Sequence, residues 1–249
     1  MFIRYILKTS AWLFLVTMSV NSLAKNYSQN SDGITLSNTR IIYPGDARNG
    51  VTYTLTNNTA YPYLLQSRIL PYSVSSSDIE MDEALPPPFI VLPPLSRIEP
   101  DTAITLRIRL TQNSLPQDRE SVFWMMLNAI PAQTEISTGQ TRLVMSTQNN
   151  LKLFYRPADL PELDDTSIAK QQEFKLNGNT LTVKNPTPFY ITFSSISVGD
   201  IKIDLQKKRM VAPFSELTWL LPTNTNGELR WQLITDDGRP GKVVIQPAG

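Results

Sequence analysis

The sequence predicts an all-β protein built from two β-sandwich domains. Short segments in which apolar and polar residues alternate recur along the whole chain, and no long amphipathic helix pattern interrupts them. Turn-forming residues separate these segments at the spacing that is typical of sandwiches. A chain of 249 residues with 19 Pro and 41% hydrophobic residues suits many short strands joined by turns.

The first 24 residues have the character of a cleaved secretory signal. Arg4 and Lys8 precede a short apolar run from Ala11 to Val20, and Ser22-Leu23-Ala24 places small residues before a cleavage site. We expect cleavage after Ala24, because the apolar run is too short for a comfortable membrane span. We therefore expect an exported protein without membrane insertion.

Composition excludes several classes of function. The net charge is +1 for the whole chain and about −1 without Arg4 and Lys8, so nothing attracts it globally to nucleic acid. The sequence contains no Cys and no His, which removes disulfides, thiol nucleophiles, His-based triads and typical zinc sites. We expect no metal and no cofactor, and only carboxylate-based catalysis stays open.

The first half of the mature chain holds the clearest strand patterns. Ile104, Leu106, Ile108 and Leu110 alternate with Thr and Arg residues, which indicates one buried and one solvated face. The other expected strands are Ile34 to Tyr43, Val51 to Leu55, Tyr63 to Leu70, Ser121 to Ile130 and Leu143 to Tyr155. The Pro-rich stretches 85–88 and 92–94 are interpreted as loops or edge-strand breaks.

The second half repeats the pattern in shorter pieces. Asn177-Gly178-Asn179 between two alternating triplets predicts a hairpin. Further strands are expected at 189–198, 201–205, 217–221, 229–234 and 242–245. The segment from Arg156 to Asp165 breaks the pattern with two Pro and several acids. We therefore expect a signal peptide at 1–24 and domains at 25–155 and 156–249.

Two segments resemble the signature sequences of the periplasmic pilus and fimbrial chaperones, the PapD-like family. The first is LPQDRESVFW from Leu115, which continues to Pro131, and the second is NLKLFYRP from Asn150 to Pro157. The resemblance is strong over 34–157 and thinner afterwards. It implies two immunoglobulin-like sandwiches set at an angle as a boomerang. It also implies a periplasmic chaperone, without ATP or enzymatic activity, that serves pilus subunits and an outer-membrane usher.

Members of this family complete an unfinished subunit by donating a strand to it. The resemblance assigns this role to the run from Thr141 to Lys152, with Leu143, Met145 and Thr147 as the side chains that fill the subunit's groove. Met is suited to varied partners because it repacks easily. Thr147 departs from the family, which has a larger apolar residue there. From periodicity alone, Leu143 and Met145 could equally face the core of their own domain.

The resemblance also assigns roles to charged residues. Arg40 and Lys152 match the two cations that bind the subunit's C-terminal carboxylate, an arrangement that would give charge-assisted hydrogen bonds and fix register. Glu120, Arg156 and Asp236 match a cluster that sets the angle between the domains. Judged by residue pattern alone, each of these would be an ordinary surface charge.

Two other classes stay open. One is a structural or adhesive extracellular protein with immunoglobulin-like domains, although the polar segment from Lys25 to Asp32 does not suit a fibre subunit's N-terminal extension. The other is a carboxylate-dependent hydrolase using Asp164-Asp165 or Asp236-Asp237. Adjacent acids beside Pro or Gly are more typical of turns. The sequence also leaves open whether the free chain self-associates.

Overall fold

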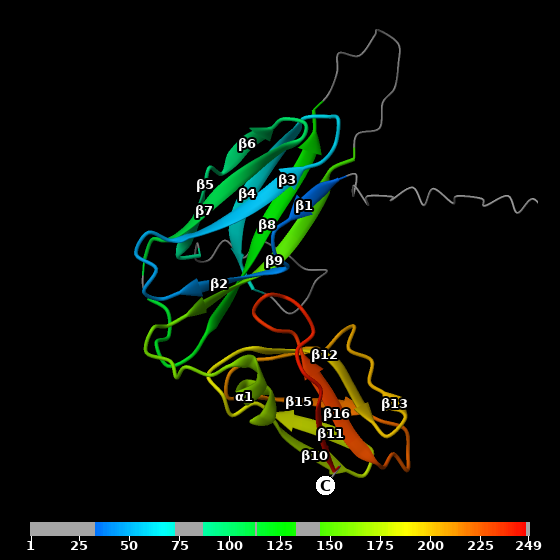
Figure 1. The fold of residues 1–249 in the computed structure, drawn as a ribbon. Helices are drawn as coiled ribbons and strands as arrows, with labels where there is room; N and C mark the ends of the chain where they lie inside the picture. Colours follow the sequence, from blue (N-terminus) through cyan, green and yellow to red (C-terminus); the bar gives the residue numbers. More distant parts are fainter. Residues whose placement is uncertain (1–32, 73–86, 113, 133–144, 248–249) are drawn as a thin grey trace, which may run out of the picture. The chain divides into compact units, whose positions relative to one another are not determined.

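The computed structural model describes residues 33–72, 87–112, 114–132 and 145–247. The expected signal peptide and Leu143 lie outside this part of the chain. Residues 31–249 form one compact unit, within which two β-sandwiches follow each other along the sequence (Figure 1). The prediction of an all-β fold with two immunoglobulin-like sandwiches is confirmed, whereas the limits 25–155 and 156–249 stay a prediction. No helix of the described residues is long and apolar enough to span a bilayer.

The first sandwich consists of two mostly antiparallel sheets. Their strand orders are β1-β3-β7-β5 and β2-β9-β8-β4-β6. Its strands are β1 (Ile34–Leu36), β2 (Arg40–Pro44), β3 (Val51–Asn57), β4 (Tyr63–Pro71), β5 (Phe89–Leu92), β6 (Leu95–Ile98), β7 (Thr102–Leu110), β8 (Ser121–Pro131) and β9 (Thr147–Arg156). The expected single strand from Ile34 to Tyr43 is wrong. The chain changes sheets between β1, which pairs with β3, and β2, which pairs with β9.

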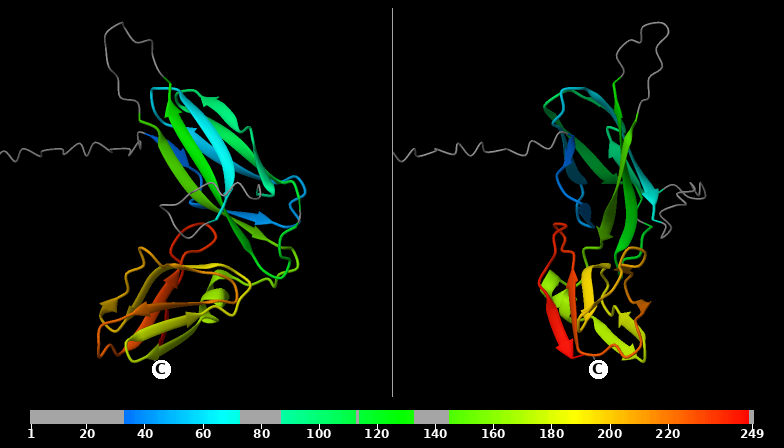
Figure 2. Two further views of the ribbon diagram at one scale, coloured as in Figure 1. Left: turned by 180° about the vertical axis from the view of Figure 1, so that it is seen from behind. Right: turned by 90° about the vertical axis from the view of Figure 1, so that its right-hand side faces the viewer.

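The second sandwich, coloured yellow to red in Figure 2, follows the first along the chain. It contains the sheets β10-β11-β15 and β13-β12-β16-β17, with β14 beside β12. Its strands are β10 (Glu173–Asn177), β11 (Thr180–Lys184), β12 (Ile191–Val198), β13 (Ile201–Lys202), β14 (Met210–Val211), β15 (Glu216–Leu220), β16 (Glu228–Leu233) and β17 (Val244–Pro247). The short helix α1 (Asp165–Lys170) precedes them. The hairpin expected at Asn177-Gly178-Asn179 forms, with Asn177 paired to Thr180 and Gly178 at φ 59°.

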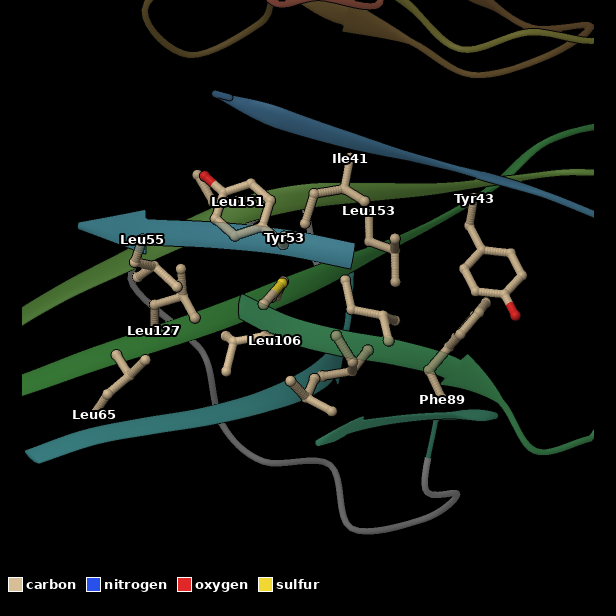
Figure 3. Close-up of a cluster of buried hydrophobic side chains, with 14 of the residues drawn as sticks. Ile41, Tyr43, Tyr53, Leu55, Leu65, Phe89, Leu106, Leu127, Leu151 and Leu153 are labelled. Carbon is tan, nitrogen blue, oxygen red and sulfur yellow. The ribbon is translucent and has the colours of Figure 1, made fainter. Parts of the chain in front are cut away.

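Each sandwich has its own apolar core. In the first, Tyr53, Leu55 and Leu106 from one sheet meet Ile41, Leu127 and other residues of the facing sheet, as Figure 3 shows. The second core is built around Trp231, Phe193 and Val198, each at most 1% exposed. Burial of such side chains contributes about 1.5–3 kcal/mol each, so two independent cores can hold the fold without disulfides.

An equivalent set of side-chain hydrogen bonds lies at the end of one strand in each sandwich. Asn57 and Asn185 are fully buried, and each donates from Nδ2 to the carbonyl oxygen four residues further along, at 2.8 and 2.7 Å. The side-chain oxygen of each accepts bonds from the backbone N–H and the hydroxyl of the Thr two residues ahead, Thr59 and Thr187. These bonds satisfy buried amides that would otherwise destabilise the fold.

Candidate functional site

β9 is the strand on which the candidate site is built. Its residues Leu151, Leu153 and Tyr155 point into the first core and are at most 7% exposed. Alternation places Thr147 on this same face. If the chain continues extended, Met145, two residues before Thr147, lies on that face as well. Both are exposed, and Met145 is 76% exposed. A row of side chains therefore runs from the core to an uncovered end of the strand.

The two edges of β9 are covered to different extents. β8 pairs with all of it except the last residue, from Ala129 with Thr147 to Ser121 with Tyr155. β2 runs parallel to it and pairs only from Arg40 with Lys152 to Pro44 with Arg156. Among the described residues, the segment 147–151 consequently has β8 on one edge and nothing on the other. Unpaired N–H and C=O groups on such an edge are ready to accept another strand.

Arg40 and Lys152 lie at the point where the open edge ends. They are register partners in the parallel pair β2–β9, so the two cations are neighbours. Arg40 is 8% exposed, donates from Nη1 to the carbonyl oxygen of Ile234 at 3.1 Å and lies over the ring of Phe154. Nζ of Lys152 lies 3.2 Å from Sδ of Met210. No carboxylate within the described ranges forms an ion pair with either side chain.

The electrostatic setting favours an anion at this point. Burial lowers the pKa of Lys152 to about 8, and repulsion from Arg40 and Arg209 acts in the same direction. Burial also lowers the pKa of Arg40, partly offset by attraction to Asp236 and Glu120. Two desolvated like charges side by side raise each other's free energy, and a bound carboxylate would relieve that repulsion.

The second charged cluster joins both sandwiches within the compact unit. Nε of Arg156 donates to Glu120 at 2.8 Å, and its two terminal nitrogens donate to Asp236 at 2.7 and 3.0 Å. Glu120, whose side chain is 2% exposed, also accepts from the backbone N–H of Tyr190. Burial raises the pKa of Glu120, although Arg156 opposes that shift. Burial acts to lower the pKa of Arg156, but Asp236 and Glu120 hold it above its usual range.

The structure also shows the partners of three of the four acids that could have supported hydrolysis. Asp164 is the N-cap of α1 and accepts from the backbone N–H of Ser167 at 2.6 Å. Asp236 binds Arg156, whereas Asp237 binds Thr235 and Arg239 inside its own turn. Each of these three carboxylates thus has a structural partner. No group of acids in the described segments has an arrangement that could hold a metal ion.

Sequence reasoning missed several residues around the cationic pair. Arg209 adds a third positive charge, and Met210 contacts Lys152. Tyr72 places its ring 5.8 Å from Nζ of Lys152. The basic run from Lys207 to Arg209 was a visible signal, but no local pattern connects it with a strand of the first sandwich. The role of the Ile234 carbonyl could not be found at all, because a backbone oxygen leaves no trace in the sequence.

The fold and the site define a class of two-sandwich β-proteins in which an open strand edge ends at a buried Arg and a half-buried Lys. Comparisons identify the family. The model of the N-terminal domain of PapD, a pili and flagellar-assembly chaperone, matches residues 33–161, and the model of the C-terminal domain of the pili assembly chaperone PapD matches 167–243. The chain therefore belongs to the PapD-like family of pilus-assembly chaperones.

Individual relatives cover nearly the whole chain. It is 31% identical to the chaperone protein PsaB of Yersinia pestis over 267 residues, which cover 96% of this chain and 94% of PsaB. It is 34% identical to the chaperone protein LpfB of Salmonella typhimurium over 236 residues, or 94% of each chain. A solved structure of the Salmonella enterica SafA pilin in complex with the SafB chaperone matches with a TM-score of 0.72 at 32% identity, covering 86% of this chain and 96% of the matched chain.

Proposed function

We propose that this protein is a periplasmic chaperone that holds incomplete pilus subunits by adding its own strand to them and passes them to an outer-membrane usher. The observation that carries the proposal is the coincidence of the open edge of β9 with the pair Arg40 and Lys152. The edge is unpaired among the described residues up to 151, and the cations lie where β2 takes over at Lys152. The family match does not favour the structural or adhesive alternative.

The geometry sets the direction in which a subunit strand would bind. A strand whose carboxylate meets Arg40 and Lys152 would occupy the edge of 147–151 and end where β2 begins. Because its last residue lies nearest Lys152, it would run parallel to β9, as β2 does. Its backbone would pair with the open edge, and the carboxylate would fix the register.

The exposed end of the core-facing row would then be covered. Thr147 and Met145 continue the row of Leu151 and Leu153 beyond the first sandwich's own core. A subunit that lacks one strand exposes an apolar groove, and these side chains would fill it together with Leu143, for which the role stays a prediction. The subunit's core would thus extend that of the chaperone. Each apolar side chain so buried would contribute about 1.5–3 kcal/mol.

Co-purification from periplasm tests this function. The tagged chain is co-expressed with the pilin-like subunit encoded beside it, and Lys152→Ala is compared with Lys170→Ala, an exposed Lys in the last turn of α1. We expect a one-to-one complex with the wild type and with Lys170→Ala, and loss of the complex with Lys152→Ala. A complex that survives Lys152→Ala would remove the anchor, and absence of any complex with the wild type would remove the function.

A further inference from the structure

A turn of the second sandwich lies against the cationic pair. It connects β16 to the segment before β17 and is closed by a bridge between Ile234 and Pro240. Inside it, the N–H of Thr235 donates to the carbonyl of Arg239 at 2.8 Å and the N–H of Gly238 donates to the carbonyl of Thr235 at 2.9 Å. Asp237 adds a bond from Nε of Arg239 at 2.6 Å. The turn is therefore held rigidly by its own contacts.

Three alternate residues of this turn contact the first sandwich. The carbonyl of Ile234 accepts from Arg40, and the carboxylate of Asp236 accepts from Arg156. Gly238 lies against Thr39, the residue before Arg40. A side chain at Gly238 would overlap Oγ1 of Thr39 and would place its Cβ 3.3 Å from the Cβ of Thr39. The turn can approach Thr39 and Arg40 this closely only because position 238 has no side chain.

We propose that Gly238 is a positioning residue for the carboxylate anchor. Its missing side chain lets the turn approach Thr39, so that the carbonyl of Ile234 reaches Arg40 and fixes the guanidinium beside Lys152. A larger residue at 238 would push the turn away and release Arg40 from that carbonyl. This inference rests on the proposed function, because it assumes that Arg40 and Lys152 bind a chain-terminal carboxylate.

A matched pair of glycines provides the test. Gly238 and Gly178 both have positive φ, +82° and +59°, so an Ala strains the backbone at either position. No atom lies within 4 Å of a Cβ built at Gly178. Gly178→Ala therefore controls for backbone strain, and Gly238→Ala adds the clash with Thr39. Thr39→Ala combined with Gly238→Ala removes Oγ1 and should relieve that clash.

The readout is selectivity for a free chain end. Binding is measured with a synthetic peptide that carries the C-terminal strand of the neighbouring pilin-like subunit, once with a free carboxylate and once as the C-terminal amide. We expect Gly238→Ala to weaken the acid peptide about tenfold, which corresponds to losing one charge-assisted hydrogen bond, and to leave the amide peptide unchanged. We expect Gly178→Ala to bind both like the wild type, and Thr39→Ala/Gly238→Ala to recover most of the loss.

Several results would overturn the inference. Unchanged binding of the acid peptide by Gly238→Ala would do so, as would an equal loss for the acid and amide peptides, or a double variant no better than Gly238→Ala. If Gly238→Ala does not fold, Asp237→Ala replaces it, because it removes bonds that hold the turn. The inference then requires that Asp237→Ala weakens binding of the acid peptide and leaves binding of the amide peptide unchanged. A wild type that binds acid and amide equally would instead refute the anchor itself, and thus the proposed function.

Discussion

At the scale of single residues, the site depends on charges that are held in unfavourable surroundings. Lys152 lies beside Arg40 and close to the charge of Arg209, and burial together with this repulsion holds its pKa at about 8. The protein therefore stores electrostatic strain at the point where it would receive an anion. Glu120 differs, because Arg156 and the N–H of Tyr190 already satisfy it.

Binding of a carboxylate-terminated peptide should depend on pH through Lys152. The bound carboxylate stabilises the ammonium and raises its pKa above the free value of about 8. Below about pH 8 Lys152 is charged in both states and affinity is constant. As pH rises further, the free protein loses this proton and affinity falls by up to about tenfold per pH unit.

Titration of peptide binding from about pH 7 to about pH 9.5 measures this effect. Lys152→Arg is the control, because a guanidinium stays charged throughout the range and its affinity should not fall in this way. An equal fall in the wild type and in Lys152→Arg would show that another group titrates.

At the scale of elements, the sequence predicted most strands but not their partners. The alternation from Ile104 to Leu110 gave β7, and Asn177-Gly178-Asn179 gave the hairpin. β5 and β6 were missed because Pro93 and Pro94 between them dominate the local pattern. The helix α1 was missed because six residues carry too little periodicity.

The candidate site was accessible only in part. Arg40, Lys152, Glu120, Arg156 and Asp236 were found by resemblance to a family motif, because their residue types alone indicate nothing beyond a solvated surface. The break between β1 and β2 was not found, since it depends on which sheet each half of the segment joins. Thr39 and Gly238 come together across almost the whole length of the chain, and no local pattern encodes such a contact.

Substitutions within β9 and just before it should have different effects, one on the stability of the chaperone and the other on subunit binding. Leu153 is fully buried, so Leu153→Ala should lower the free energy of unfolding by about 2–5 kcal/mol. Met145, two residues before β9, is exposed, so Met145→Ala should change stability by less than about 0.5 kcal/mol and, if Met145 belongs to the donated strand, still reduce the yield of the subunit complex.

Urea denaturation and co-purification of the same two variants provide these measurements. A large loss of stability in Met145→Ala would place Met145 in the chaperone's own core and would remove it from the donated strand. Normal complex formation by Met145→Ala would do the same on the binding side.

At the scale of the whole molecule, two separately packed cores lie within one compact unit. The bonds of Arg156 to Glu120 and Asp236, the contact of Arg40 with Ile234 and the bond from the N–H of Glu120 to the carbonyl of Pro188 connect them. Ring contacts of Phe154 with Tyr190 and of Arg119 with Phe214 add to these polar links, so the coupling between the two cores combines ion pairs with aromatic packing.

Removing Asp236 should weaken this coupling. Asp236→Ala takes away a two-pronged, partly exposed ion pair worth about 1 kcal/mol, and we expect its calorimetric unfolding to broaden or split into two transitions. Asp200→Ala, an exposed acid in the turn between β12 and β13, should leave the wild-type profile unchanged. Identical calorimetric profiles for both variants would show that the coupling lies elsewhere.

Binding of a chain-terminal carboxylate by the cationic pair at the end of the open edge would have a consequence for which polypeptides can be held. A main-chain carboxylate exists only after synthesis of a protein is complete, so the site would bind only partners whose synthesis has ended. A partner cut by a protease would present its carboxylate at the wrong residue, and its side chains would then point to the wrong faces. An affinity tag at the partner's C-terminus would therefore prevent binding, whereas a tag at its N-terminus would not.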